Sequence, residues 1–263
     1  MLDQNRIASS DFETDRLLEA ATGMSSTEFA IASSIDTPSE EAALRLTARR
    51  LTGEPLQYVT GVSGFRNVEL ELGPGVFIPR PETELVAERA MALLPERGIL
   101  FEIGTGAGAI ALAVADERPD ARVLATESSP EALAWAKKNV DRLAADIELL
   151  EGDLFAPFAD DLQKQVDVVV SNPPYVAEGE TLPPEVVDWE PKEALFAGPD
   201  GLEVLNAIAS GARSWLRHGG FVVLEIGETQ GQRARDLLRR LDYSDVAVAA
   251  DLTGRDRIAE GRA

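Results

Sequence analysis

The sequence of 263 residues contains no cysteine and a single histidine, His218. The lack of cysteine excludes disulfides and thiolate metal ligands, and one histidine cannot supply a site that needs two. There is also no apolar run long enough to span a bilayer, and the polar start MLDQNRIASSDFETD lacks the apolar segment of a signal peptide. We therefore expect a cytoplasmic protein with no metal site and no membrane partner.

Basic residues are few, with 25 Lys and Arg against 46 Asp and Glu and a net charge of −21. Nucleic-acid binding depends on the neutralisation of phosphates by cations, so this balance weighs mildly against DNA or RNA as a partner, although a local basic patch could override it. We expect no stable nucleic-acid binding and interpret the acidity chiefly as a solubilising or salt-adapted surface.

The first part of the chain predicts a helical domain followed by a connecting hairpin. "TDRLLEAATG" and "SEEAALRLTARRLTG" carry apolar residues at helical spacing, which indicates a small all-helical domain over residues 1–60. The stretch "FRNVELELGPGVFIPRPETELV" alternates between apolar and polar residues on both sides of Gly73-Pro74-Gly75. This pattern predicts a β-hairpin linker over residues 61–82 that turns at those three residues.

From residue 83 to 263, apolar strand patterns such as "ILFEIG", "ARVLATE", "VDVVVS" and "GFVVLEIG" alternate with helical ones. Such alternation is typical of an α/β domain with a doubly wound, mostly parallel sheet and helices on both of its faces. We expect seven strands, the last two from "VAVAADLTGRDRIAEGR". His218 follows "GLEVLNAIASGARSWLR", where we expect it to cap the end of a helix.

The segment "FEIGTGAGAIAL" places Gly104, Gly106 and Gly108 between the first strand of this domain and its helix. Glycines permit a tight turn and let a ligand approach the backbone, while the helix N-terminus adds free N–H groups. Glu127 ends the next strand, where a carboxylate can accept two hydrogen bonds from a ribose diol. The pattern fits either NAD or S-adenosylmethionine, but the single histidine lies far from the place where a hydride-transfer enzyme usually needs a proton donor.

A later strand ends in "VDVVVSNPPY", which puts Asn172 at the same edge of the sheet as the glycine loop. Pro173 and Pro174 have no N–H, so this segment offers carbonyl acceptors, to which Asn172 adds an amide and Tyr175 a flat face. Asn172 Oδ1 and the Pro173 carbonyl could each accept one hydrogen of a planar NH2 group. During methyl transfer from a sulfonium, such acceptors stabilise the positive charge that develops on the attacking nitrogen.

These residues resemble the amino-methyltransferase branch of the S-adenosylmethionine-dependent class I methyltransferases, which includes DNA adenine, rRNA guanine and protein glutamine enzymes. Three further segments resemble the peptide chain release factor glutamine methyltransferases. They are Gly53–Val86, Glu190–Leu205 ("EPKEALFAGPDGLEVL") and Asp251–Arg257 ("DLTGRDR"). Relatives that act on a ribosomal-protein glutamine typically carry Pro-Arg-Ser-Pro in the linker. The linker here reads Pro79-Arg80-Pro81-Glu82, which favours the release-factor branch.

The resemblance implies a Rossmann-like class I methyltransferase fold and S-adenosyl-L-methionine as cofactor. The residues it assigns to the methionine part of the cofactor are Gly104, Thr105, Gly106, Ala107 and Gly108. Glu127 would bind the ribose, and Asn172 would border the cofactor. Asp153 and Leu154 would flank the adenine, although some relatives have an aromatic residue in place of Leu154, so stacking is lost here.

The resemblance also implies the substrate, which is the glutamine of the Gly-Gly-Gln loop in class I peptide chain release factors. Asn172, Pro173, Pro174 and Tyr175 would hold its side chain, with Asn172, Pro173 and Tyr175 as the catalytic residues. Phe77 and Arg80 lie in the linker that covers the active site in this family, and Phe77 serves equally well as a packed hairpin residue. The helical domain would recognise the protein partner.

Three alternatives remain from the sequence. An exocyclic amine of a nucleic acid could take the place of the glutamine, and the acidic charge weighs against it. A ribosomal-protein glutamine could be the substrate instead. The chain could also bind the cofactor without catalysis, as the partner of another subunit, and the intact glycine loop and Asn-Pro-Pro-Tyr segment weigh against that.

Overall fold

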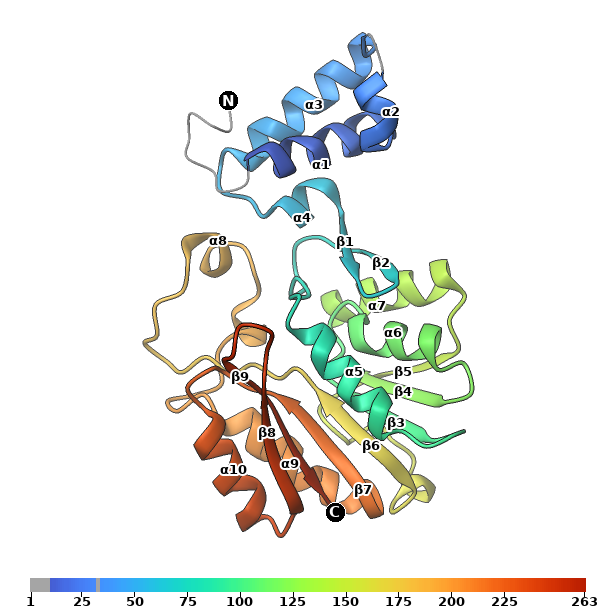
Figure 1. Ribbon diagram of the computed structural model, residues 1–263, viewed down its shortest axis with the longest axis vertical. Coiled ribbons are helices and arrows are strands. Elements are labelled where there is room, and N and C mark those ends of the chain that lie inside the picture. The colour runs from blue at the N-terminus through green and yellow to red at the C-terminus, as the bar shows by residue number, and fades with distance from the viewer. Residues whose placement is uncertain (1–9, 32–33) are drawn as a thin grey trace. The chain divides into compact units, whose positions relative to one another are not determined.

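The computed structural model describes residues 10–31 and 34–263 (Figure 1). Spatial proximity divides the chain into two compact units. The smaller unit contains the described residues of Met1–Val62 together with Leu72–Pro74 and Leu182–Glu190. The larger unit contains Ser63–Glu71, Gly75–Thr181 and Pro191–Ala263.

The smaller unit consists of short helices around a few leucine and valine side chains. Its helices are α1 (Ser10–Thr22), α2 (Ser26–Ile31), α3 (Thr37–Arg50), α4 (Leu56–Thr60) and α8 (Pro184–Val187). The side chain of Asp36 caps α3 by accepting the Ser39 N–H at 2.9 Å, and Pro38 lies in the first turn. Leu17 and Val59 form the centre of the core. Arg50 is buried and is held by Glu13 through two hydrogen bonds of 2.6 and 3.0 Å.

The hairpin after α4 is shorter than the sequence pattern predicts, and its turn is elsewhere. Strands β1 (Val62–Phe65) and β2 (Val68–Glu71) pair in a two-stranded sheet and are joined at Arg66 and Asn67. The predicted turn at Gly73-Pro74-Gly75 was wrong, because these residues follow β2 and no second strand comes after them before α5 (Thr83–Leu93). Residues 72–82 therefore form an irregular segment.

The larger unit contains a seven-stranded sheet in the order β5-β4-β3-β6-β7-β9-β8 (Figure 1). Its strands are β3 (Ile99–Ile103), β4 (Arg122–Glu127), β5 (Ile147–Glu151), β6 (Val166–Ser171), β7 (Leu216–Glu225), β8 (Ser244–Ala250) and β9 (Asp256–Arg262). Strands β3 to β7 are parallel, and β9 runs antiparallel to both β7 and β8. The predicted doubly wound, mostly parallel sheet is confirmed.

Alternate residues of the central strands pack on opposite faces of the sheet, because side chains alternate along a strand. Leu100, Val168 and Val170 join one core with α5 and with α6 (Ala109–Glu117), and α7 (Pro130–Leu143) packs at its border. Phe101 and Val169 join the other core with α9 (Glu203–Trp215) and α10 (Gly231–Arg240). The central strands are thus covered on both sides, which explains their continuous apolar sequences.

The single histidine does not cap a helix as predicted. Helix α9 ends at Trp215, and the chain turns extended at Leu216 to pair with Val166 of β6. His218 is therefore an exposed residue of β7.

Within residues 10–31 and 34–263, no helix has the length and apolar character needed to cross a membrane. The same residues contain no cluster of three side chains suited to bind a metal ion.

Candidate active site

The ends of β3 and β6 bring the two predicted motifs together. The strands are parallel neighbours with Glu102 opposite Val170, so Ile103 and Ser171 end them side by side. The Ser171 hydroxyl donates to the Ile103 carbonyl at 2.6 Å and is fully buried. The glycine loop and the Asn172 segment therefore leave the sheet from adjacent positions, as expected for a ligand site at the carboxyl ends of parallel strands.

The glycine loop has the backbone that its sequence requires. Gly104, Gly106 and Gly108 have φ angles of +70°, +59° and +91°, a region that side-chain-bearing residues rarely adopt. A Cβ atom at Gly104 would meet nothing within 4 Å, whereas one at Gly108 would lie 3.0 Å from Leu112 Cδ1. The loop is therefore open at its first glycine, where a ligand can approach, and closely packed at its last.

Glu127 ends β4 with its carboxylate already held in place. Its Oε2 accepts the Gly106 N–H at 2.8 Å, and its Oε1 accepts the Ser129 N–H at 2.9 Å. The Glu127 carbonyl accepts the Gly152 N–H at 3.0 Å, which brings the loop after β5 to the same place. In that loop Asp153 is exposed, while Leu154 is half-buried and its carbonyl accepts the Thr126 hydroxyl at 2.9 Å. The predicted cofactor residues are thus gathered in one region.

Glu102 is a buried acid beneath the glycine loop that the sequence reasoning missed. Its Oε2 accepts the Thr105 hydroxyl at 2.6 Å and the Ala111 N–H at 2.9 Å. Burial raises its pKa to about 8. The signal in the sequence was an acid inside the apolar strand Ile99–Ile103, directly before the first glycine. The side chain ties the loop to the start of α6.

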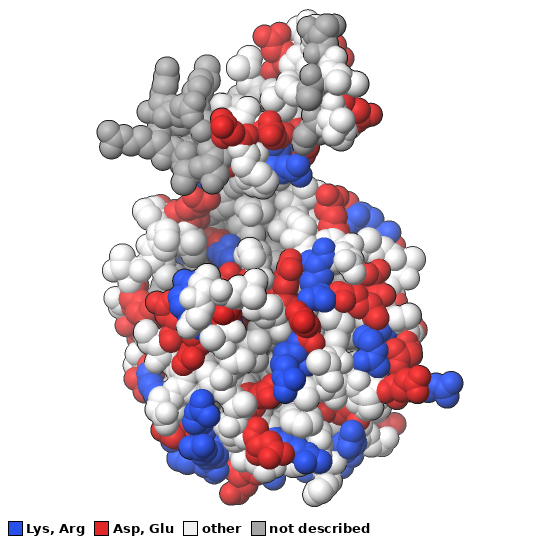
Figure 2. Space-filling model, in the orientation of Figure 1, with Lys and Arg blue, Asp and Glu red and all other residues white. Residues whose placement is uncertain are grey.

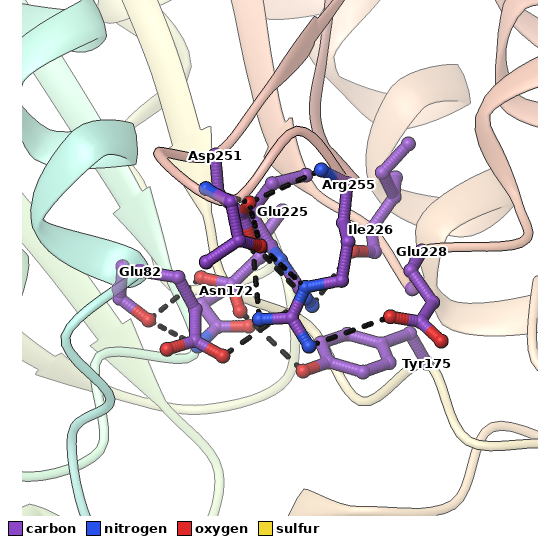
Figure 3. A network of polar contacts seen from close by, with 12 residues as sticks. Glu82, Asn172, Tyr175, Glu225, Ile226, Glu228, Asp251 and Arg255 are labelled. Carbon is purple, nitrogen blue, oxygen red and sulfur yellow. Dashed lines mark hydrogen bonds and ion pairs between the residues drawn. The ribbon is translucent and has the colours of Figure 1, made fainter.

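Hydrogen bonds link the Asn172 side chain to α5 and, through α5, to β7, whose residue Glu225 is labelled with Asn172 in Figure 3. Asn172 Nδ2 donates to Thr83 Oγ1 at 3.1 Å, and the Thr83 hydroxyl is 2.7 Å from Glu225 Oε2. Among the described residues, Asn172 Oδ1 makes no hydrogen bond. Pro173 is buried, whereas Asn172 and Tyr175 are half-buried. The amide oxygen is thus available as an acceptor.

Tyr175 is anchored at both its hydroxyl and its backbone. Its hydroxyl lies 3.5 Å from Glu225 Oε1, and its carbonyl accepts Gln230 Nε2 at 2.8 Å. Burial, and next the charge of Glu225, raise the pKa of Tyr175. The phenol therefore keeps its proton at neutral pH, which makes it a hydrogen-bond donor and a wall of the site, not a base.

The "DLTGRDR" segment, of which Figure 3 labels Asp251 and Arg255, supplies the buried cation Arg257 to the same network. Arg257 is 5% exposed, donates to the Ile226 carbonyl at 3.4 Å and lies 3.7 Å from Asp251 Oδ2 and 4.0 Å from Glu82 Oε1. Asp251 in turn accepts the Thr253 N–H at 2.8 Å. The sequence alone gives this segment no role, because its partners lie in distant parts of the chain.

Phe77 and Arg80 contact each other within the segment before α5. The Arg80 guanidinium lies 4.6 Å from the centre of the Phe77 ring, a cation–π contact. The positive charge of Arg80 also acts on Tyr175, where it opposes the rise in pKa. The neighbouring Val76 would lie 3.9 Å from a Cβ atom at Gly106. This segment therefore runs beside the glycine loop and near Tyr175.

Two family models match the chain, the PrmC N-terminal domain over residues 1–61 and the Methyltransferase small domain over residues 81–188. A release factor glutamine methyltransferase of Mycolicibacterium smegmatis is 44% identical over 85% of this chain and 81% of its own length. One of Geobacter sulfurreducens is 38% identical over 99% and 92%. A methyltransferase structure from Pyrococcus furiosus, 19% identical, has a TM-score of 0.59 over 83% of this chain and 98% of its own, a likeness in fold. The chain therefore belongs to the release factor glutamine methyltransferase family.

Proposed function

We propose that the protein transfers a methyl group from S-adenosyl-L-methionine to the side-chain amide nitrogen, N5, of the glutamine in the Gly-Gly-Gln motif of class I peptide chain release factors. The observation that carries this proposal is a free acceptor, Asn172 Oδ1, next to the Pro173 carbonyl. The strand that ends before Asn172 is paired with the strand that ends before the glycine loop. Membership of the family supports the choice of a protein glutamine over a nucleic-acid amine.

The residues of the glycine loop fit the cofactor. The open side of Gly104 leaves room for a ligand against the backbone, and the fixed Glu127 carboxylate keeps acceptor capacity for two ribose hydroxyls. Asp153 and Leu154 lie beside Glu127, where an adenine ring would follow the ribose. Bound S-adenosylmethionine supplies an electrophilic methyl group on a positively charged sulfur.

The Asn172 segment would hold the substrate nitrogen for an in-line attack. Asn172 Oδ1 and the Pro173 carbonyl each accept one N–H of the glutamine amide, which directs the nitrogen lone pair toward the methyl carbon. The cofactor would supply the methyl group, with the N–C bond forming as the C–S bond breaks, so that the positive charge would move from sulfur to nitrogen. The two acceptors stabilise this charge more in the transition state than in the ground state, and one proton leaves to water afterwards.

The remaining parts of the chain would serve recognition. We assign residues 1–60 to recognition of the release factor and residues 61–82 to the connection with the catalytic domain, residues 83–263. Phe77 and Arg80 would enclose the glutamine side chain, since they contact each other in a segment that passes the glycine loop at Val76, and since the charge of Arg80 acts on Tyr175. Nucleic acid has no part in this assignment.

The substrate is tested by labelling. The protein is incubated with methyl-labelled S-adenosylmethionine and, separately, with a release factor, with tRNA and rRNA, and with DNA, and the label is located by mass spectrometry. We expect label on the glutamine of the release factor. Label on nucleic acid, with none on the release factor, would refute the proposal.

The role of Asn172 is tested by Asn172→Ala, with Asn206→Ala in the exposed part of α9 as the matched control. Removal of one preorganised hydrogen-bonding group at a developing charge lowers kcat by roughly 10²- to 10³-fold. We expect this loss in Asn172→Ala with little change in the dissociation constant of the cofactor, and no loss in the control. Equal losses of turnover and cofactor binding would make Asn172 a cofactor residue.

A further inference from the structure

A buried polar chain runs from Asn172 to Glu225 and is left unexplained by substrate binding alone. Thr83 is 3% exposed and Glu225 is fully buried, so solvent does not reach the middle of the chain. The three side chains come from the loop after β6, the first turn of α5 and the last residue of β7. Figure 3 labels the two ends of the chain, Asn172 and Glu225. Thr83 and Glu225 are 142 residues apart in sequence, so only the folded structure brings them into hydrogen-bond contact.

The direction of the hydrogen bonds in this chain follows from the single proton of a hydroxyl. An ionised carboxylate can only accept hydrogen bonds, so the Thr83 hydroxyl donates its one hydrogen bond to Glu225 Oε2, at 2.7 Å. The Thr83 oxygen can then only accept from its other neighbour. That neighbour must be the NH2 end of Asn172, at 3.1 Å, which leaves Asn172 Oδ1 turned away from Thr83.

We propose that Thr83 and Glu225 are positioning residues, which together hold the Asn172 amide with its oxygen toward the substrate nitrogen. This inference rests on the function proposed above. With the amide reversed, Asn172 would present N–H groups to the N–H groups of the glutamine. Donor would face donor, and the acceptor that stabilises the developing positive charge would be lost.

The ionisation of Glu225 decides whether the chain keeps its direction. A protonated Glu225 can donate to Thr83 Oγ1, which frees the Thr83 proton for Asn172 Oδ1 and permits the reversed amide. Burial raises the pKa of Glu225 to about 7. Arg257 and the hydrogen bonds from Thr83 and Tyr175 favour the carboxylate, whereas Glu82 opposes it. Turnover should therefore rise as the pH increases through about 7.

The hydroxyl is tested with Thr83→Val, which removes it with little change in volume, and Thr83→Ser, which restores it. Tyr243→Phe is the control, since that variant removes another buried hydroxyl bond, 2.7 Å to the Ala209 carbonyl, away from the site. For methylation of a release factor, we expect kcat of Thr83→Val to fall roughly 10- to 100-fold, with KM and cofactor affinity nearly unchanged. Thr83→Ser should recover most of the loss, and Tyr243→Phe should keep the wild-type kcat.

The carboxylate is tested with Glu225→Gln. Between pH 6 and 8 the wild-type kcat should rise, while that of Glu225→Gln should be nearly independent of pH, because the amide does not titrate in this range. A merely structural role would not produce this difference. Equal kcat losses in Thr83→Val and Thr83→Ser, or the same pH profile in Glu225→Gln and wild type, would overturn the inference.

A measurement without substrate separates this inference from the proposed function. The side-chain ¹⁵NH2 signal of Asn172, identified by its loss in Asn172→Ala, should shift between pH 6 and 8 in the wild type and not in Glu225→Gln. A signal that does not move in the wild type would overturn the positioning role even if the release factor is methylated. A moving signal in a protein that leaves release factor unmodified would refute the substrate assignment alone.

Discussion

The buried acid beneath the glycine loop gives a strong prediction about stability. Glu102 is 2% exposed, and burial raises its pKa from an ordinary value of 4.5 to about 8. Between these two values the folded protein holds a proton that the unfolded chain has released. The free energy of unfolding therefore falls as the pH rises, by about 1.4 kcal/mol per pH unit from this group and about 5 kcal/mol over the whole interval.

Glu102→Gln should remove this dependence. The glutamine oxygen can accept the bonds from Thr105 and Ala111 that Glu102 Oε2 now accepts, and it carries no charge. At pH 5 the variant should resemble the wild type, and by pH 8 it should be more stable by several kcal/mol. Urea unfolding at each pH, with the exposed Glu193→Gln as control, measures the difference. Parallel pH curves for Glu102→Gln and wild type would refute the argument.

Further substitutions test the role of Glu127 and the packing of the glycine loop. Glu127→Ala should raise the dissociation constant of S-adenosylmethionine roughly 10- to 100-fold, the worth of hydrogen bonds to a charged group, in a calorimetric titration; an unchanged constant would contradict the ribose assignment. Gly108→Ala and Gly179→Ala share the cost of a positive φ, +91° and +88°, but only at Gly108 does the new Cβ meet a neighbour, Leu112 at 3.0 Å. Gly108→Ala should therefore be the more destabilising by about 1–3 kcal/mol in thermal unfolding, and equal losses would show that the loop relaxes without strain.

Much of the candidate site was predictable because its motifs are local and lie at strand ends. The glycines, Glu127 and Asn172 each follow or end an apolar strand, and parallel strands end at the same edge of a sheet. The strand pattern, together with the motifs at the strand ends, therefore predicted that these residues lie at one edge of the sheet. The chemistry proposed for the Asn172 segment rests on its missing N–H groups.

The supporting residues were not predictable, because their roles depend on long-range neighbours. Thr83 looks like an ordinary helix start, and Glu225 like the end of a strand, until the fold brings them within 2.7 Å. Arg257 likewise became meaningful only beside Asp251 and Glu82. Nothing in the local sequence distinguishes Thr83 or Arg257 from surface residues.

The misplaced hairpin turn has a similar cause. Glycine and proline at residues 73–75 are the stronger local turn signal, yet the chain turns at Arg66, whose φ is +49°. Its side chain is held by Glu117, with Nη2 2.8 Å from Oε2, and its backbone N–H donates to Glu84 Oε1 at 3.0 Å. These tertiary bonds offset the cost of a left-handed arginine, which local propensity cannot anticipate.

The pairing of β3 with β6 sets the distance between the two parts of the candidate site. The glycine loop follows one strand and the Asn172 segment follows its neighbour, and their separation is set by the residues that face each other, Glu102 and Val170. A single residue inserted within β6 would displace Asn172 by about 3.3 Å and turn the strand's apolar side chains to the wrong face. These two strands tolerate substitution more readily than any insertion or deletion.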